Sequence, residues 1–156
     1  MAEIAARLSQ VAMNSITEVD AFISASLSTD EITPKLKNGI DAVRNGLRAV
    51  ATEGANRKAG ICDCPVDHFS ELMQDAHESV SGSTPSLGPG RSMAAAMLRI
   101  ASAVARRAEV DLVAASIVTA ASLGFMRAVP GLLTAIADEL DAEEWRRIPV
   151  EIRTDK

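Results

Sequence analysis

The first 26 residues carry apolar side chains at spacings of three and four, and this period constrains the fold more than any other feature. The apolar positions are Ile4, Leu8, Val11, Ala12, Ile16, Val19, Phe22 and Ile23. Such spacing places them on one face of an α-helix. We therefore expect a helix from Ala2 to Ser26, about 37 Å long, a length typical of a helical bundle or of a seam between subunits.

A duplicated heptad follows, in which KNGIDAV at 37–43 is succeeded by RNGLRAV at 44–50. Thr33 and Pro34 suit the N-cap and the first position of a second long helix, and Gly54 predicts its end. The two heptads place a row of apolar and glycine positions on one face of this helix, and we expect this seam to contact a second copy or another protein. The seam consists of Leu36, Gly39, Ile40, Val43, Gly46, Leu47 and Val50.

The two glycines of this seam each cost about 1 kcal/mol relative to Ala inside a helix. Gly39 and Gly46 lie one heptad apart, which indicates that another backbone approaches closely on that side. The alternative is a duplicated heptad in which the glycines are simply tolerated.

Three more helices are predicted after residue 91. A helix over 92–107 should break near 107–109, because continuing its apolar face would bring Asp111 into the core. A buried apolar helix over 110–128, a sixth helix over 130–146 and an extended tail over 148–156 complete the chain. Since only 3% of the residues are aromatic and Ala, Leu, Ile and Val supply the apolar mass, we expect one all-α domain of about six helices over 1–156.

Every cysteine and histidine falls between residues 62 and 77. Cys64 suits the N-cap of a helix over 65–78, and the Ser-, Gly- and Pro-rich stretch 79–90 predicts a flexible loop. Zinc or iron could be bound by Cys62, Cys64 and His68, completed by Glu71 or Asp75. His77 lies about half a turn from His68, so the cysteines and histidines cannot all converge.

Two other interpretations of this segment remain open. Cys64 at a helix N-terminus would have a lowered thiol pKa, and Cys62 could resolve its oxidised form, as in a redox pair. Alternatively, Cys64 is a helix start, and the polar residues that follow it form a solvated face.

Four arginines, at 91, 99, 106 and 107, lie in an acid-free segment over 91–107 of a chain whose formal net charge is −5. No aromatic residues alternate with them, so stacking on nucleic acid has little support. We therefore do not expect nucleic acid as a partner, and nucleic-acid binding through this segment is the weakest of the functional alternatives.

The longest uncharged stretch, Leu112 to Met126, is 15 residues long, short of the roughly 20 that span a membrane. It predicts a core helix and no membrane span. The N-terminus lacks the pattern of a signal peptide, and two cysteines one residue apart cannot form a disulfide framework. We expect a cytoplasmic protein.

The sequence carries no catalytic signature, and we assign no catalytic residue. It predicts a non-enzymatic interaction or regulatory protein that acts through helical surfaces, as a homo-oligomer or with a protein partner. The alternative is a metal-binding or thiol-redox module centred on Cys62, Cys64 and His68.

Overall fold

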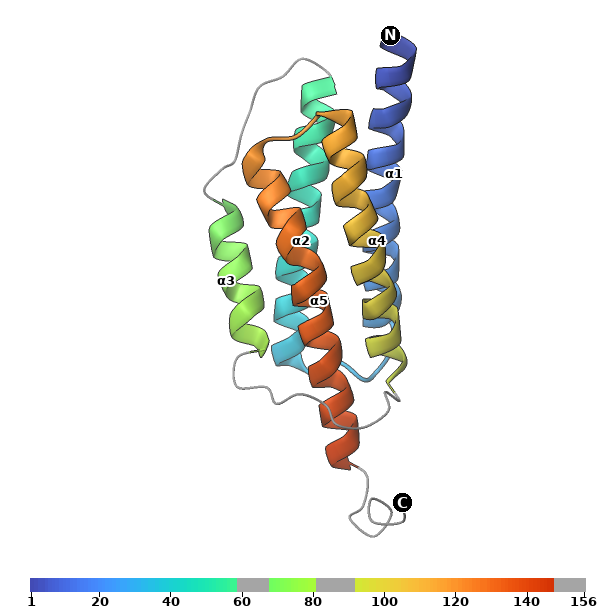
Figure 1. The fold of residues 1–156 in the computed structure, drawn as a ribbon. Helices are drawn as coiled ribbons and strands as arrows, with labels where there is room; N and C mark the ends of the chain where they lie inside the picture. The colour runs from blue at the N-terminus through green and yellow to red at the C-terminus, as the bar shows by residue number, and fades with distance from the viewer. Residues whose placement is uncertain (59–67, 81–91, 148–156) are drawn as a thin grey trace.

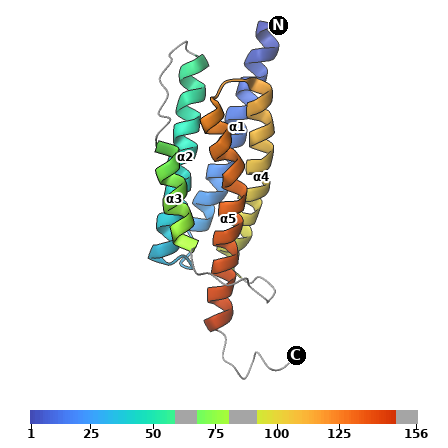
Figure 2. The ribbon, with the colours of Figure 1, turned by 60° about the vertical axis from the view of Figure 1, so that its left-hand side comes forward.

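The computed structural model describes residues 1–58, 68–80 and 92–147, and this part of the chain forms five helices and no strand. The helices are α1 (Ala2–Leu27), α2 (Pro34–Lys58), α3 (His68–Val80), α4 (Met93–Ala115) and α5 (Ala120–Arg147). Four long helices run side by side as a bundle, and the shorter α3 packs against α2 and α5 (Figures 1 and 2). The all-α fold is confirmed. The expected tail over 148–156 and residues 81–90 of the expected loop lie outside the described residues.

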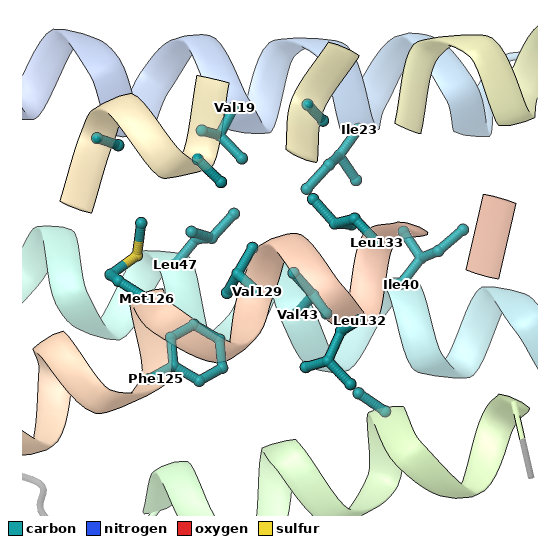
Figure 3. Packing of buried hydrophobic residues seen from close by; sticks show 14 of the residues in the cluster. Val19, Ile23, Ile40, Val43, Leu47, Phe125, Met126, Val129, Leu132 and Leu133 are labelled. Atoms are coloured by element: carbon teal, nitrogen blue, oxygen red, sulfur yellow. The ribbon is translucent and has the colours of Figure 1, made fainter. Parts of the chain in front are cut away.

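All five helices contribute buried side chains to one core. Val19 and Ile23 of α1 approach Leu47 of α2 and Leu133 of α5 (Figure 3), and each of these side chains is at most 1% exposed. Full burial of one such side chain contributes about 1.5–3 kcal/mol. The apolar face predicted for the first helix is therefore a core face over its C-terminal half.

The helix predicted from Pro34 continues beyond Gly54 to Lys58. A Cβ atom at Gly54 would lie 3.1 Å from the sulfur of Met13 and 3.2 Å from a side-chain carbon of Ile117. Gly54 is therefore a position where α1 and the turn after α4 pack against α2, and it does not end the helix.

The break expected near 107–109 does not occur, because Asp111 has a polar partner. The Ser15 hydroxyl of α1 donates a hydrogen bond to Asp111 at 2.5 Å, which allows α4 to continue to Ala115 with the carboxylate half-buried. The chain turns at Ser116, whose φ of 52° is left-handed. The single buried helix expected over 110–128 is thus divided between α4 and α5.

The sixth helix expected from Pro130 is the second half of α5. Proline removes one backbone hydrogen bond and commonly ends or kinks a helix. Here Val129 and Leu133, on either side of Pro130, are both fully buried, so the two halves of α5 share one core. The Ser102 hydroxyl of α4 also donates to the carbonyl oxygen of Pro130 at 2.9 Å.

Among the described helices, only α5 is long and apolar enough, by length and composition, to cross a membrane. Half of its most apolar window is buried inside the bundle, where α5 contacts α2, α3 and α4. The core helix of a bundle meets the same criteria, so this property is only weak evidence for a membrane span.

Candidate functional site

The proposed metal ligands fall at the edge of the described chain. Cys62 and Cys64 lie outside the described residues, and so does the expected N-cap at Cys64. His68 is the first residue of α3, while Glu71 and Asp75 are exposed on that helix. Within the described ranges, no three His, Cys, Asp or Glu side chains are grouped so as to hold a metal ion. The metal site remains a prediction from the sequence.

The seam of α2 that we expected to meet a partner is covered by the chain itself. All seven of its residues are buried: Leu36, Gly39, Ile40, Val43, Gly46, Leu47 and Val50. In this bundle the seam offers no free face to a second protein. The heptad pattern indicates a covered face, but it does not state which chain covers it.

The space left by the two glycines is filled from within the chain, mainly by side chains and not by the closely approaching backbone that we expected. A Cβ at Gly39 would lie 2.0 Å from the Ser79 hydroxyl of α3, and one at Gly46 would lie 2.0 Å from the ring of Phe125 in α5. Phe125 in turn stacks on Phe69 of α3, with ring centroids 5.1 Å apart. The glycines therefore admit α3 and α5 against α2.

The carboxylate of Glu53, which is 2% exposed, caps the start of α5. It accepts hydrogen bonds from the backbone N–H of Thr119 and from the hydroxyls of Thr119 and Ser122, and Arg57 lies 3.6 Å away. A carboxylate is favoured at a helix N-terminus because unpaired N–H groups and the helix dipole meet it there. This buried acid therefore serves the fold, and both of its oxygens are occupied.

The start of α4 is held in the same way from two directions. Glu31 accepts hydrogen bonds from the Ser92 hydroxyl at 2.7 Å and from the Ala94 N–H at 2.8 Å. Buried Asp141 of α5 accepts from the Ser92 N–H at 3.3 Å. Glu31 and Asp141 thus cap the start of α4, as Glu53 caps the start of α5.

Two of the three described arginines in the expected basic segment are paired with acids. Arg99 lies 2.9 Å from Asp138 and 2.5 Å from Asp141, and Arg107 pairs with Glu18. Partial burial lowers the pKa of Arg99, but its hydrogen bonds to the two aspartates outweigh this and raise the pKa above its ordinary value. Arg91 lies outside the described residues. The pairing removes much of the charge that a nucleic acid would need.

An open groove of about 480 Å³ runs between α2 and α3, and nothing in the sequence pattern pointed to it. Its lining is Lys35, Asn38, Asp41, Ala42, Asn45, Leu72, Asp75, Glu78 and Ser79. Three carboxylates, two amides and a lysine are among its lining groups, and the carboxylates do not form a cation-binding set. The groove is a mixed polar surface.

The N-terminal end of α1 is exposed although its side chains are apolar. Ile4 is 60%, Leu8 37% and Val11 49% exposed. Helices α1 and α4 run antiparallel, and Ser15 of α1 contacts Asp111 of α4. Ala115, the last residue of α4, therefore lies level with Val11. Residues Met1–Val11, which we call the α1 overhang, extend past that level (Figures 1 and 2).

The sequence pattern places Ile4, Leu8 and Val11 on the same apolar face as the core residues of α1, because the helical period does not change along the helix. Their exposure depends on where α2 and α4 end. The contact of Gly54 with Met13 places Lys58, the last residue of α2, level with Ser9. Beyond that level neither α2 nor α4 covers α1.

No protein-family model matches the sequence, and no curated protein is significantly similar to it. Function is therefore inferred from the surfaces of the bundle.

Proposed function

We propose that this chain is a non-enzymatic interaction protein that docks with other protein chains through the α1 overhang. The observation that carries the proposal is the run of exposed apolar side chains at Ile4, Leu8 and Val11. Single exposed apolar residues are ordinary on a protein surface, whereas a contiguous apolar patch commonly marks an interaction site.

The helical state of the overhang supports this role. The overhang continues a helix that the core holds, but a terminal segment without tertiary contacts frays in water. Within the overhang, a pair between Arg7 and Glu3 at 2.7 Å adds only about 0.3–0.5 kcal/mol. A partner that covers the apolar face would supply the missing stabilisation.

The test is the state of the protein purified under native conditions from its own cells. Native mass spectrometry should find it in a complex of defined stoichiometry that Leu8→Glu abolishes. Ala6→Glu is the matched control, because Ala6 is exposed on the opposite side of the same helix. A chain that is found alone, or a complex indifferent to Leu8→Glu, would contradict the proposal.

The metal or thiol-redox module remains a second candidate, because all cysteines and histidines fall between residues 62 and 77. Elemental analysis of the wild type and of the Cys62→Ser/Cys64→Ser variant tests it. Near-stoichiometric zinc or iron in the wild type alone would make this segment the functional centre. Metal in neither, with equal thermal stability, would remove the metal-binding form of this candidate. The thiol-redox form predicts instead that Cys64 is alkylated faster than an ordinary thiol at neutral pH.

A further inference from the structure

We propose that Asn38 and Asn45 are sites of spontaneous deamidation that the folded bundle holds off, and that reaction at either site lastingly weakens the packing on α2. The proposal is independent of the α1 overhang, since it uses only the duplicated heptad of α2 and the helices that contact it.

Each copy of the duplicated heptad contains an asparagine followed by a glycine. In the first copy Asn38 precedes Gly39, and both members of the second pair, Asn45 and Gly46, occupy the same heptad positions. Both asparagine side chains are exposed. The backbone nitrogen that follows an asparagine can attack the side-chain amide, and glycine hinders this attack least because it has no Cβ.

The reaction exchanges water for ammonia. The glycine nitrogen, after losing its proton to hydroxide, forms a bond to the side-chain carbonyl carbon of the asparagine. The side-chain nitrogen takes a proton from water and leaves as ammonia, and a cyclic imide remains. Water then breaks a C–N bond of this ring at either carbonyl carbon. One product is aspartate, and the other is isoaspartate, in which the main chain is longer by a methylene group.

The helix blocks the first step at both sites. Gly39 and Gly46 lie inside α2, so the N–H of each donates to the carbonyl oxygen four residues earlier. The main chain at the asparagine must also leave its helical conformation before the ring can close. Reaction therefore proceeds only from the fraction of chains in which α2 is open at that glycine.

The two sites differ in how firmly the bundle keeps α2 closed. Gly46 lies at the middle of α2 and is covered by the ring of Phe125, which is buried and stacked on Phe69. Gly39 lies near the N-terminal end of α2, and its neighbour is Ser79, near the end of the shorter α3. Because helix ends open more readily than helix centres, the first asparagine should react before the second.

The duplication makes the two sites directly comparable. A basic residue precedes each asparagine, Lys37 or Arg44, and a large aliphatic residue follows each glycine, Ile40 or Leu47. The two segments therefore have closely similar intrinsic rates in the unfolded chain. A difference between them in the folded protein reports local opening of α2.

Either product disturbs the contacts made at the glycines. A Cβ at Gly39 would overlap Ser79 and one at Gly46 would overlap Phe125, so the extra methylene of isoaspartate displaces each glycine from a tight fit. Both asparagines also line the groove between α2 and α3, which already contains three carboxylates. Either product adds like charge there. A modified chain therefore opens more readily, and refolding does not reverse the change.

Incubation of the full chain at mildly alkaline pH, with and without urea, tests the proposal. Peptide mass spectrometry follows each asparagine, and Asn56 is the control because Arg57 follows it and hinders ring closure. In urea, Asn38 and Asn45 should react at similar rates and well ahead of Asn56. In native buffer Asn45 should slow by about a thousandfold or more, the ratio of folded to unfolded chains in an ordinary domain, and Asn38 should react before it. Rates that urea leaves unchanged, or reaction at Asn45 as early as at Asn38 in native buffer, would overturn the proposal.

Hydrogen exchange of the α3 amides tests the consequence of the reaction. Asn45→Asp adds the carboxylate without the extra methylene, and Asn14→Asp adds the same charge at an exposed position of α1. Exchange in α3 should be fastest in chains that carry isoaspartate at position 45, slower in Asn45→Asp, and unchanged from the wild type in Asn14→Asp. Exchange in the isoaspartate chains no faster than in Asn14→Asp would overturn the proposed weakening of α3.

Discussion

The hydroxyl of Ser15 in α1 donates a hydrogen bond of 2.5 Å to the carboxylate of Asp111 in α4. Ser15 is buried and Asp111 is half-buried, so the bond lies at the edge of the core. This contact sets the register between the two helices and allows α4 to carry an aspartate where its pattern predicts an apolar residue.

Ser15→Ala should destabilise the protein by about 1–3 kcal/mol, because Asp111 loses its partner in a half-buried position. Urea denaturation measures the change. The double variant Ser15→Ala/Asp111→Leu removes both polar groups and should recover most of the loss. If the double variant loses more unfolding free energy than the two single variants lose together, the Ser15–Asp111 pair is not the cause of the destabilisation.

Gly46→Ala should destabilise by about 1–3 kcal/mol, because the new methyl group would overlap the ring of Phe125. The helix preference of Ala over Gly works in the opposite direction. Gly131→Ala is the matched control in α5: nothing lies within 4 Å of its Cβ position, so it should stabilise by up to about 1 kcal/mol. Equal effects at both sites in thermal unfolding would contradict the close packing at Gly46.

Glu53→Ala should cost about 2–4 kcal/mol, because the start of α5 and the Ser122 hydroxyl lose their buried acceptor. Glu53→Gln keeps one acceptor oxygen and should cost less. Glu3→Ala serves as the exposed control, since it removes only a surface pair with Arg7 worth a few tenths of a kcal/mol. A larger loss of unfolding free energy for Glu3→Ala than for Glu53→Ala in chemical denaturation would refute the capping role.

Arg99→Met should destabilise by about 1–2 kcal/mol, since it leaves the buried carboxylate of Asp141 without its cation. Arg106→Met, an exposed change seven residues further along the same helix, should stay within about 0.5 kcal/mol of the wild type. Thermal unfolding of the two variants measures the difference. If they unfold at the same temperature, the ion pair contributes nothing.

Local signals in the sequence were sufficient for several elements. The first two helices begin where predicted, at Ala2 and Pro34, because apolar periodicity and a proline at the first helical position depend on neighbouring residues alone. The need for space at Gly39 and Gly46 also followed from the sequence, since glycine inside a helix is costly unless something needs the space, but side chains and not a backbone fill most of it.

Other features depend on residues far apart in the chain. Asp111 stays in a continuous helix because of Ser15, which is 96 positions away. The turn before α5 is held by Glu53, which is 69 positions from Ser122. The one local signal that was missed is Thr119, whose hydroxyl accepts from the Ser122 N–H at 3.4 Å, the pattern of a helix N-cap.

The sequence by itself determined that this chain is helical and which residues form apolar faces, because both properties repeat along the chain with the period of the helix. Only the tertiary structure decided which faces are covered. The seam of α2 is buried by α1, α3 and α5, while the equally apolar end of α1 is exposed because α2 and α4 end before it. Coverage depends on the lengths and registers of packed helices, and these are set by contacts between distant residues.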